Sequence, residues 1–123
     1  SFRSEFVTKD DAEDVSGVRW IIENSFHELQ DITIFSEIYG DVSVPTSTMV
    51  VPAGSASFNK DTKQFTWEIE TMPVAVDILP LQFSVMRHTI NPSQTQLMSK
   101  IELRATDAVT GEEILLLGDE ILL

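Results

Sequence analysis

The two histidines are the first side chains to consider for chemistry, because imidazole can carry a proton in catalysis and can bind zinc. His27 and His88 lie far apart in the sequence and neither belongs to a His-x-x-x-His pair. A zinc site would need the fold to bring both of them together with a carboxylate. We expect instead that both are solvent-facing residues in loops or at strand ends, and that no metal binds there.

The densest acidic cluster is a second candidate for metal binding. It consists of Asp10, Asp11, Glu13 and Asp14. Calcium requires about six to eight oxygen ligands, and this stretch lacks the D-x-[DN]-x-[DN]-G frame of a calcium loop. Three distant carboxylates could join only through the fold: Asp61, Asp107 and Asp119. We therefore predict a solvated acidic loop, with calcium binding as the alternative, and no cofactor.

Sequence signatures of an enzyme are missing. The chain contains no cysteine, so it can form neither a disulfide framework nor a thiolate metal site. It has no G-x-S-x-G elbow and no glycine-rich phosphate loop. Its 20 acidic residues make some carboxylate pair inevitable, so a pair alone indicates nothing. We predict that the chain is not an enzyme, and its net charge of −12 disfavours nucleic acid as a partner.

Aromatic residues decide whether the chain could stack against sugars. Trp20 and Trp67 alternate with apolar residues, which predicts that both are buried. Phe35 and Tyr39 are better candidates for an exposed carbohydrate platform, although Phe35 could equally pack under a loop.

The chain that must position these residues is long enough for a single domain over residues 1–123. Its 42% hydrophobic content is that of a globular protein, and no apolar run approaches the roughly 18 residues that span a bilayer. Because the first residue is Ser rather than Met, we predict that the domain is excised from a longer protein.

A hairpin over residues 58–69 is the predicted centre of the fold. Phe65, Trp67 and Ile69 share one face, which is the period of two of a half-buried strand, and residues 59–64 have the composition of a turn. Residues 15–31 are ambiguous between a strand and an amphipathic helix. Gly17 and the β-branched pair Ile21-Ile22 favour the strand.

The remaining strands follow from the same alternation and from turn residues. We predict strands around Ile32 and Ile34, over 42–44 at a sheet edge, over 79–85, over 97–105 as one long strand, and over 114–117. Residues 107–111 form a predicted hairpin loop in which Gly111 has positive φ. The total of seven to nine strands at regular spacing predicts an all-β antiparallel sandwich.

Several of these segments resemble the conserved repeat domain of bacterial and archaeal cell-surface proteins. The matching residues are Val18-Arg19-Trp20-Ile21-Ile22-Glu23-Asn24, Leu29-Gln30-Asp31-Ile32-Thr33-Ile34, Pro52-Ala53-Gly54, and Phe58-Asn59 with Phe65-Thr66-Trp67-Glu68-Ile69 and Met72-Pro73. The chain departs from the family pattern at Tyr39-Gly40-Asp41, which stands in place of L-P-x-G, and in residues 74–79, which lack the usual glycine. The resemblance implies an immunoglobulin-like sandwich that is extracellular or cell-surface attached and often repeated in tandem. It carries no catalytic or binding residues.

The resulting functional hypothesis is a non-catalytic spacer of a prokaryotic cell-surface or secreted protein, anchored through parts outside this chain. Its expected partners are neighbouring domains, and a surface protein or glycan is a further possible partner. The alternative is an adhesion or ligand-binding module for carbohydrate, protein or calcium, acting through loops 46–54 or 107–111. A third hypothesis is an accessory domain of a secreted hydrolase. Exposed strands at 42–44 or 114–117 could also pair with another chain.

Overall fold

A computed structural model of the chain describes residues 2–10, 15–23, 27–72, 78–88 and 92–122, with the backbone alone for residues 2–10. The elements are β1 (Phe2–Asp10), β2 (Val15–Glu23), β3 (Leu29–Glu37), β4 (Val42–Ser43), the short 3-10 helix η1 (Thr46–Thr48), β5 (Ser55–Asn59), β6 (Gln64–Met72), β7 (Ile78–Arg87), β8 (Gln96–Met98), β9 (Ile101–Asp107), β10 (Glu113–Gly118) and β11 (Ile121–Leu122). Within these described ranges, no helix is long and apolar enough to cross a membrane.

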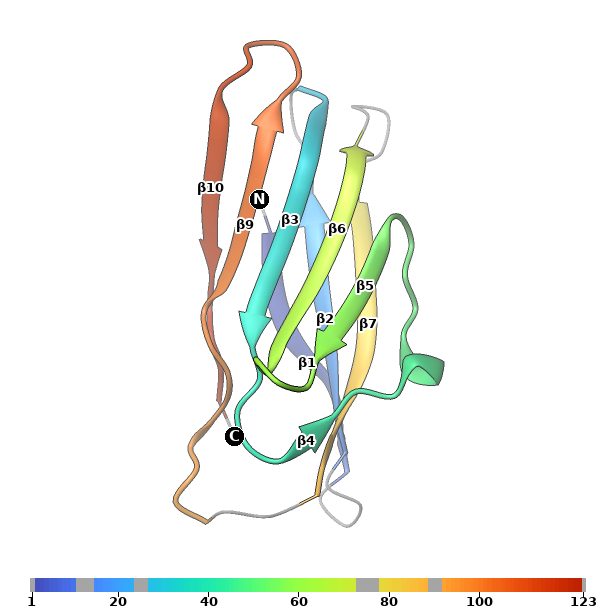
Figure 1. The fold of residues 1–123 in the computed structure, drawn as a ribbon, viewed down its shortest axis with the longest axis vertical. Helices are drawn as coiled ribbons and strands as arrows, with labels where there is room; N and C mark the ends of the chain where they lie inside the picture. Colours follow the sequence, from blue (N-terminus) through green and yellow to red (C-terminus); the bar gives the residue numbers. More distant parts are fainter. Residues whose placement is uncertain (1, 11–14, 24–26, 73–77, 89–91, 123) are drawn as a thin grey trace.

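Two antiparallel sheets form a sandwich with an immunoglobulin-like fold. One sheet has the order β1-β2-β7-β4, the other has the order β10-β9-β3-β6-β5, and β11 pairs with β8. The five-stranded sheet lies in front of β1, β2 and β7 in Figure 1. In the described part of the chain, eight strands have five or more residues, while β4, β8 and β11 have two or three. The prediction of an all-β antiparallel sandwich with seven to nine strands is confirmed.

The core forms because alternate residues of facing strands are large and apolar. Trp20 of β2 and Phe83 of β7 come from one sheet, and Phe65 of β6 comes from the other; all three are buried. Trp20 meets both phenylalanines edge-on, at centroid distances of 5.2 and 5.5 Å, and the two phenylalanines stack at 4.1 Å. Each such ring removes about 150–250 Å² from water. This cluster therefore ties the two sheets together.

Residues 15–23 are a strand, so the helix alternative is wrong. β2 pairs with β1 on one side and with β7 on the other. Val18, Trp20 and Ile22 enter the core, while Ile21 is buried on the opposite face. A strand that is covered on both faces accommodates consecutive apolar residues, which explains why its alternation was hard to see in the sequence.

The hairpin of β5 and β6 is not the centre of the fold. β3 is the middle strand of the five-stranded sheet, and β5 is an edge. The register of the hairpin is nevertheless as expected, with Phe58 opposite Phe65 and Asn59 opposite Gln64. Alternation within a strand identifies its buried face, but it does not identify the strand's neighbours.

The expected long strand over 97–105 is also wrong, because it is divided into β8 and β9. Leu97 and Met98 are consecutive and both are buried, which breaks the period of two. At the break, the Ser36 hydroxyl donates to the Ser99 carbonyl at 2.9 Å, and the Ser99 hydroxyl accepts from the Glu37 N–H at 2.9 Å. These bonds satisfy backbone groups that a continuous ladder would otherwise satisfy.

Candidate functional site

The two histidines lie at opposite ends of the sandwich. His27 precedes β3 and lies beside the β9–β10 hairpin, at the upper end of Figure 1. His88 follows β7 at the lower end, where its Nε2 lies 2.8 Å from the Ser43 hydroxyl of β4. The fold therefore does not combine them into one site.

His27 makes one notable contact, with Asp107 at the end of β9. The Nδ1 atom of the histidine lies 2.6 Å from Oδ2 of the carboxylate. The other carboxylate oxygen accepts from the N–H groups of Val109 and Thr110, at 2.8 and 3.1 Å. The hydrogen bond with His27 lowers the pKa of Asp107 below its usual value; partial burial opposes this shift, and the two backbone bonds support it. The carboxylate thus links the start of β3 to the β9–β10 loop.

The carboxylates considered for calcium do not form a cluster in the part of the chain that the structure describes. Asp10 is the last residue of β1, whereas Asp11, Glu13 and Asp14 lie outside the described residues. Asp61 lies in the β5–β6 turn, at the end of the sandwich opposite to the β9–β10 hairpin that begins at Asp107 (Figure 1). Across the described ranges, no three His, Asp or Glu residues are arranged to hold a metal ion.

Both tryptophans are fully buried, as predicted. Nε1 of Trp67 donates to the Ala53 carbonyl at 2.8 Å. In contrast, Nε1 of Trp20 is buried and has no hydrogen-bond partner within the described structure. Neither ring is available for stacking against a ligand.

The two aromatic residues considered for sugar binding are only half-exposed. Phe35 lies on the outer face of β3, where the guanidinium of Arg104 is 5.5 Å from its ring centroid. The guanidinium thus lies over one face of the ring in a cation–π contact. Tyr39 is also half-buried, and its backbone carbonyl accepts from the Gln94 amide at 3.2 Å.

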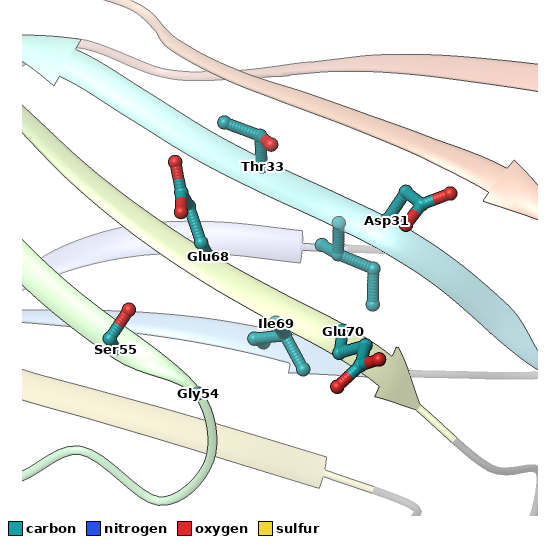
Figure 2. A pocket seen from close by; sticks show the side chains of 8 residues that line it. Asp31, Thr33, Gly54, Ser55, Glu68, Ile69 and Glu70 are labelled. Atoms are coloured by element: carbon teal, nitrogen blue, oxygen red, sulfur yellow. The ribbon is translucent and has the colours of Figure 1, made fainter.

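A shallow depression lies on the outer face of β3, β6 and β5. It is lined by Asp31, Ile32, Thr33, Gly54, Ser55, Glu68, Ile69 and Glu70. Figure 2 shows the carboxylates of Asp31, Glu68 and Glu70 spread along this surface rather than directed at one point. Such an arrangement offers negative charge to solvent but no coordination shell.

The shape of the depression arises from two backbone irregularities. Asp31 has a φ of 51°, and the register between β3 and β9 shifts between Gln30 and Thr33. Gly54 has a φ of 69°, and a Cβ there would lie only 2.0 Å from the Glu68 carbonyl oxygen. Gly54 stands at the end of the loop 46–54 that the sequence predicts, whereas no sequence pattern pointed to the irregularity at Asp31. Aspartate tolerates positive φ, so its type alone gave only a weak signal.

The described core contains no ionisable side chain. Its buried polar residues are Ser16 and Ser36, and all other buried side chains are apolar. The described interior thus consists of packing groups rather than of proton donors or acceptors.

Comparisons with known proteins agree with this architecture. No protein-family model matches the sequence, and no curated protein sequence matches it either. Among solved structures, the full-length major pilin SpaD from Corynebacterium diphtheriae is similar over 99% of this chain and 34% of its own, with a TM-score of 0.66 and 13% identity. Three N-terminal domains of the type V pili tip protein Mfa5 from Porphyromonas gingivalis match over 79% of this chain and 21% of theirs, with a TM-score of 0.62 and 11% identity.

Part of a glycoside hydrolase structure has a similar fold. The GH20 exo-β-N-acetylglucosaminidase from Vibrio harveyi matches over 96% of this chain and 17% of its own, with a TM-score of 0.58 and 11% identity. The chain thus spans about a fifth of the Mfa5 structure, a third of the SpaD structure and less of the enzyme. These likenesses show the immunoglobulin-like fold of domains found in bacterial pilins.

Proposed function

We propose that this chain is a non-catalytic structural module, a spacer, of a prokaryotic cell-surface or secreted protein. The observation that carries the proposal is the interior: apolar side chains from both sheets fill the described core, and no charged group lies among them. Such a core produces a stiff unit but supplies no reactive group.

The comparisons support this role at the level of architecture. Two of the three similar structures described above are pilus proteins, and in each the likeness covers only a part of the longer chain. By analogy, the partners of this module are the neighbouring domains of its own chain or adjacent subunits. Its location is the cell surface, with anchoring through other parts of the protein. Membership of the conserved-repeat family remains a prediction.

The test is an in-frame deletion of residues 1–123 from the native gene. A spacer predicts that the rest of the protein is still displayed on intact cells, while a distal epitope moves closer to the cell surface in immunogold images. Replacing the module with an unrelated sandwich domain of similar length should restore the spacing. Loss of a binding activity that the unrelated domain fails to restore would contradict the spacer role.

An adhesion module is the second candidate, favoured by the acidic depression at the end of loop 46–54. Calcium is the ligand to test first, because it would be held by carboxylate oxygens. Addition of calcium should raise the unfolding temperature of a calcium module, and chelation should lower it again. Since Asp31, Glu68 and Glu70 do not converge, we expect that neither calcium nor a chelator shifts the unfolding temperature. That result would exclude calcium as the ligand of such an adhesion module.

A further inference from the structure

The last long strand, β10, has an unusual surface for the edge of a sheet. It pairs with β9 and, within the described residues, with no other strand. Leu115, Leu116 and Leu117 are 58%, 38% and 64% exposed. Figure 1 shows β10 at the outer side of the five-stranded sheet. Natural edge strands are usually protected by charges, prolines or bulges, and the central residues of β10 have none of these.

The leucines occupy both faces of the strand. Leu116 stands opposite the buried Leu103 of β9, so it extends the core-facing side of the sheet. Leu115 and Leu117 stand opposite Arg104 and Glu102 and therefore extend the outer side. One strand added alongside β10 would cover leucine side chains on both faces at once.

The backbone of β10 offers hydrogen bonds at defined positions. The N–H of Asp107 donates to the carbonyl of Glu112 at 2.8 Å, which marks this as a hydrogen-bonded pair. In an antiparallel ladder such pairs alternate, so Ile114 and Leu116 also bond to β9. The N–H and C=O groups of Leu115 and Leu117 consequently point toward the free edge.

The charges around β10 indicate what kind of strand fits. Glu112 and Glu113 precede the leucines, and Asp119 and Glu120 follow them. The cation of β9, Arg104, already pairs with Glu102 at 3.1 Å. Two copies of β10 aligned along their length would place carboxylates against carboxylates at both ends, in parallel or antiparallel pairing, and each copy carries a net charge of −12. The charges therefore disfavour a second copy and favour a strand with basic ends.

We propose that β10 is a docking edge for an extended strand of a partner protein that has apolar residues in its middle and Lys or Arg at both ends. The partner strand continues the five-stranded sheet by main-chain hydrogen bonds to Leu115 and Leu117. Its apolar side chains cover the leucines, and its basic ends pair with the carboxylates that flank them. This inference is independent of the spacer role, because either can hold without the other.

Synthetic peptides test the proposal directly on the folded domain. The probe is the peptide KKVIVTVKK, and its matched controls are EEVIVTVEE, which reverses the charge, and KKVIPTVKK, whose central proline removes a main-chain donor. We expect the basic peptide to bind at least about tenfold more tightly than either control, with an affinity that falls as salt is added. Equal affinities for all three peptides, or no binding of KKVIVTVKK up to about 1 mM, would overturn the proposal.

Variants locate the binding edge. The double substitution L115K/L117K should reduce affinity for KKVIVTVKK by at least about tenfold, because it opposes the basic peptide and removes outer-face leucines. S55K/S57K adds the same charge to exposed positions of β5, at the opposite edge of the sheet, and should leave affinity nearly unchanged. Both pairs are exposed, so unfolding temperatures should show that the variants remain folded. An equal loss of affinity in the two variants would overturn the assignment to β10.

Hydrogen exchange supplies an independent readout. The peptide should slow exchange of the Leu115 and Leu117 amides, whereas the Ile114 and Leu116 amides, already bonded to β9, should change little. Slowed exchange confined to other strands would overturn the proposal.

Sedimentation of the domain without peptide tests whether a second copy of the chain binds this edge instead. A dimer that strengthens with salt and disappears in L115K/L117K would show that a second copy, and not a basic partner strand, binds this edge.

Discussion

Two hairpins flank β3 in the same sheet, and their turns are built alike. Oδ1 of Asn59 accepts from the N–H groups of Asp61 and Thr62, at 2.9 and 3.2 Å. Oδ1 of Asp107 accepts from the N–H groups two and three residues further along, at 2.8 and 3.1 Å. A residue with positive φ then follows in each turn: Lys63 at 60° and Gly111 at 75°.

The strands that these turns connect differ in their surroundings. In the β5–β6 hairpin, Phe65 and Trp67 are fully buried, and the indole of Trp67 bonds to Ala53. In the β9–β10 hairpin, the second strand exposes its leucines. Local turn chemistry therefore specifies that a hairpin forms, while the place of each strand in the sheet decides whether its apolar residues are interior or available to a partner.

The largest difference in the free energy of unfolding should come from glycine substitutions near the two hairpins. In G54A the new Cβ would meet the Glu68 carbonyl at 2.0 Å in a left-handed backbone conformation, so we expect a loss of about 3 kcal/mol or more in the free energy of unfolding. G111A has the same backbone constraint but no atom within 4 Å, and should lose about 1 kcal/mol. Urea unfolding measures both, and equal losses would show that the close approach at Gly54 is not tight.

Two tryptophan variants separate the contribution of packing to stability from that of the Trp67 hydrogen bond. W67F removes ring volume and leaves the Ala53 carbonyl without its indole donor, so we expect a loss of about 2–3 kcal/mol. W20F removes similar volume from the facing sheet, but it also removes an N–H that has no partner. W20F should therefore cost about 1 kcal/mol less than W67F in chemical denaturation. A larger loss for W20F would contradict this assignment of the hydrogen bond.

Removal of the two turn acceptors should have a smaller effect. N59A and D107A each delete a side-chain oxygen that satisfies two backbone N–H groups, so each variant should lose stability and unfold at a lower temperature. D107A also loses the contact with His27, so its loss should be the larger of the two. Thermal unfolding of both variants at neutral pH measures the difference; a larger loss in N59A would contradict the role of His27.

The smallest expected effect is a difference between the two turns in how stability depends on pH. The pKa of Asp107 is lowered in the folded protein, so its ionised form favours folding. That stability is present above the unfolded pKa of an aspartate, about 3.9, and is lost as the pH falls through the lower folded value. D107N keeps an oxygen for the turn but removes the titration.

We therefore expect the unfolding temperature of the wild type to fall more steeply below about pH 4 than that of D107N. N59A should keep the acid sensitivity of the wild type, because the amide side chain of Asn59 carries no ionisable group. Parallel pH profiles for the wild type and D107N would show that Asp107 contributes no acid sensitivity.

Much of the fold was predictable because strands and turns are local. The faces of β6 and β7, the edge strand over 42–43 and the positive φ of Gly111 all follow from alternation and residue type. The candidate site was much less predictable. The contact between His27 and Asp107 and the irregularity at Asp31 depend on segments that are distant in sequence but adjacent in the sheet.

The amino-acid sequence by itself determined which residues are apolar on each strand, where the chain turns, and that the two tryptophans are interior. Only the tertiary structure decided that β3 is central, that residues 97–105 divide between two strand pairings, and that β10 is an edge with exposed leucines. The physical reason is that side-chain alternation encodes the buried face of a strand, whereas the order of strands depends on main-chain hydrogen bonds, which are chemically the same in every strand.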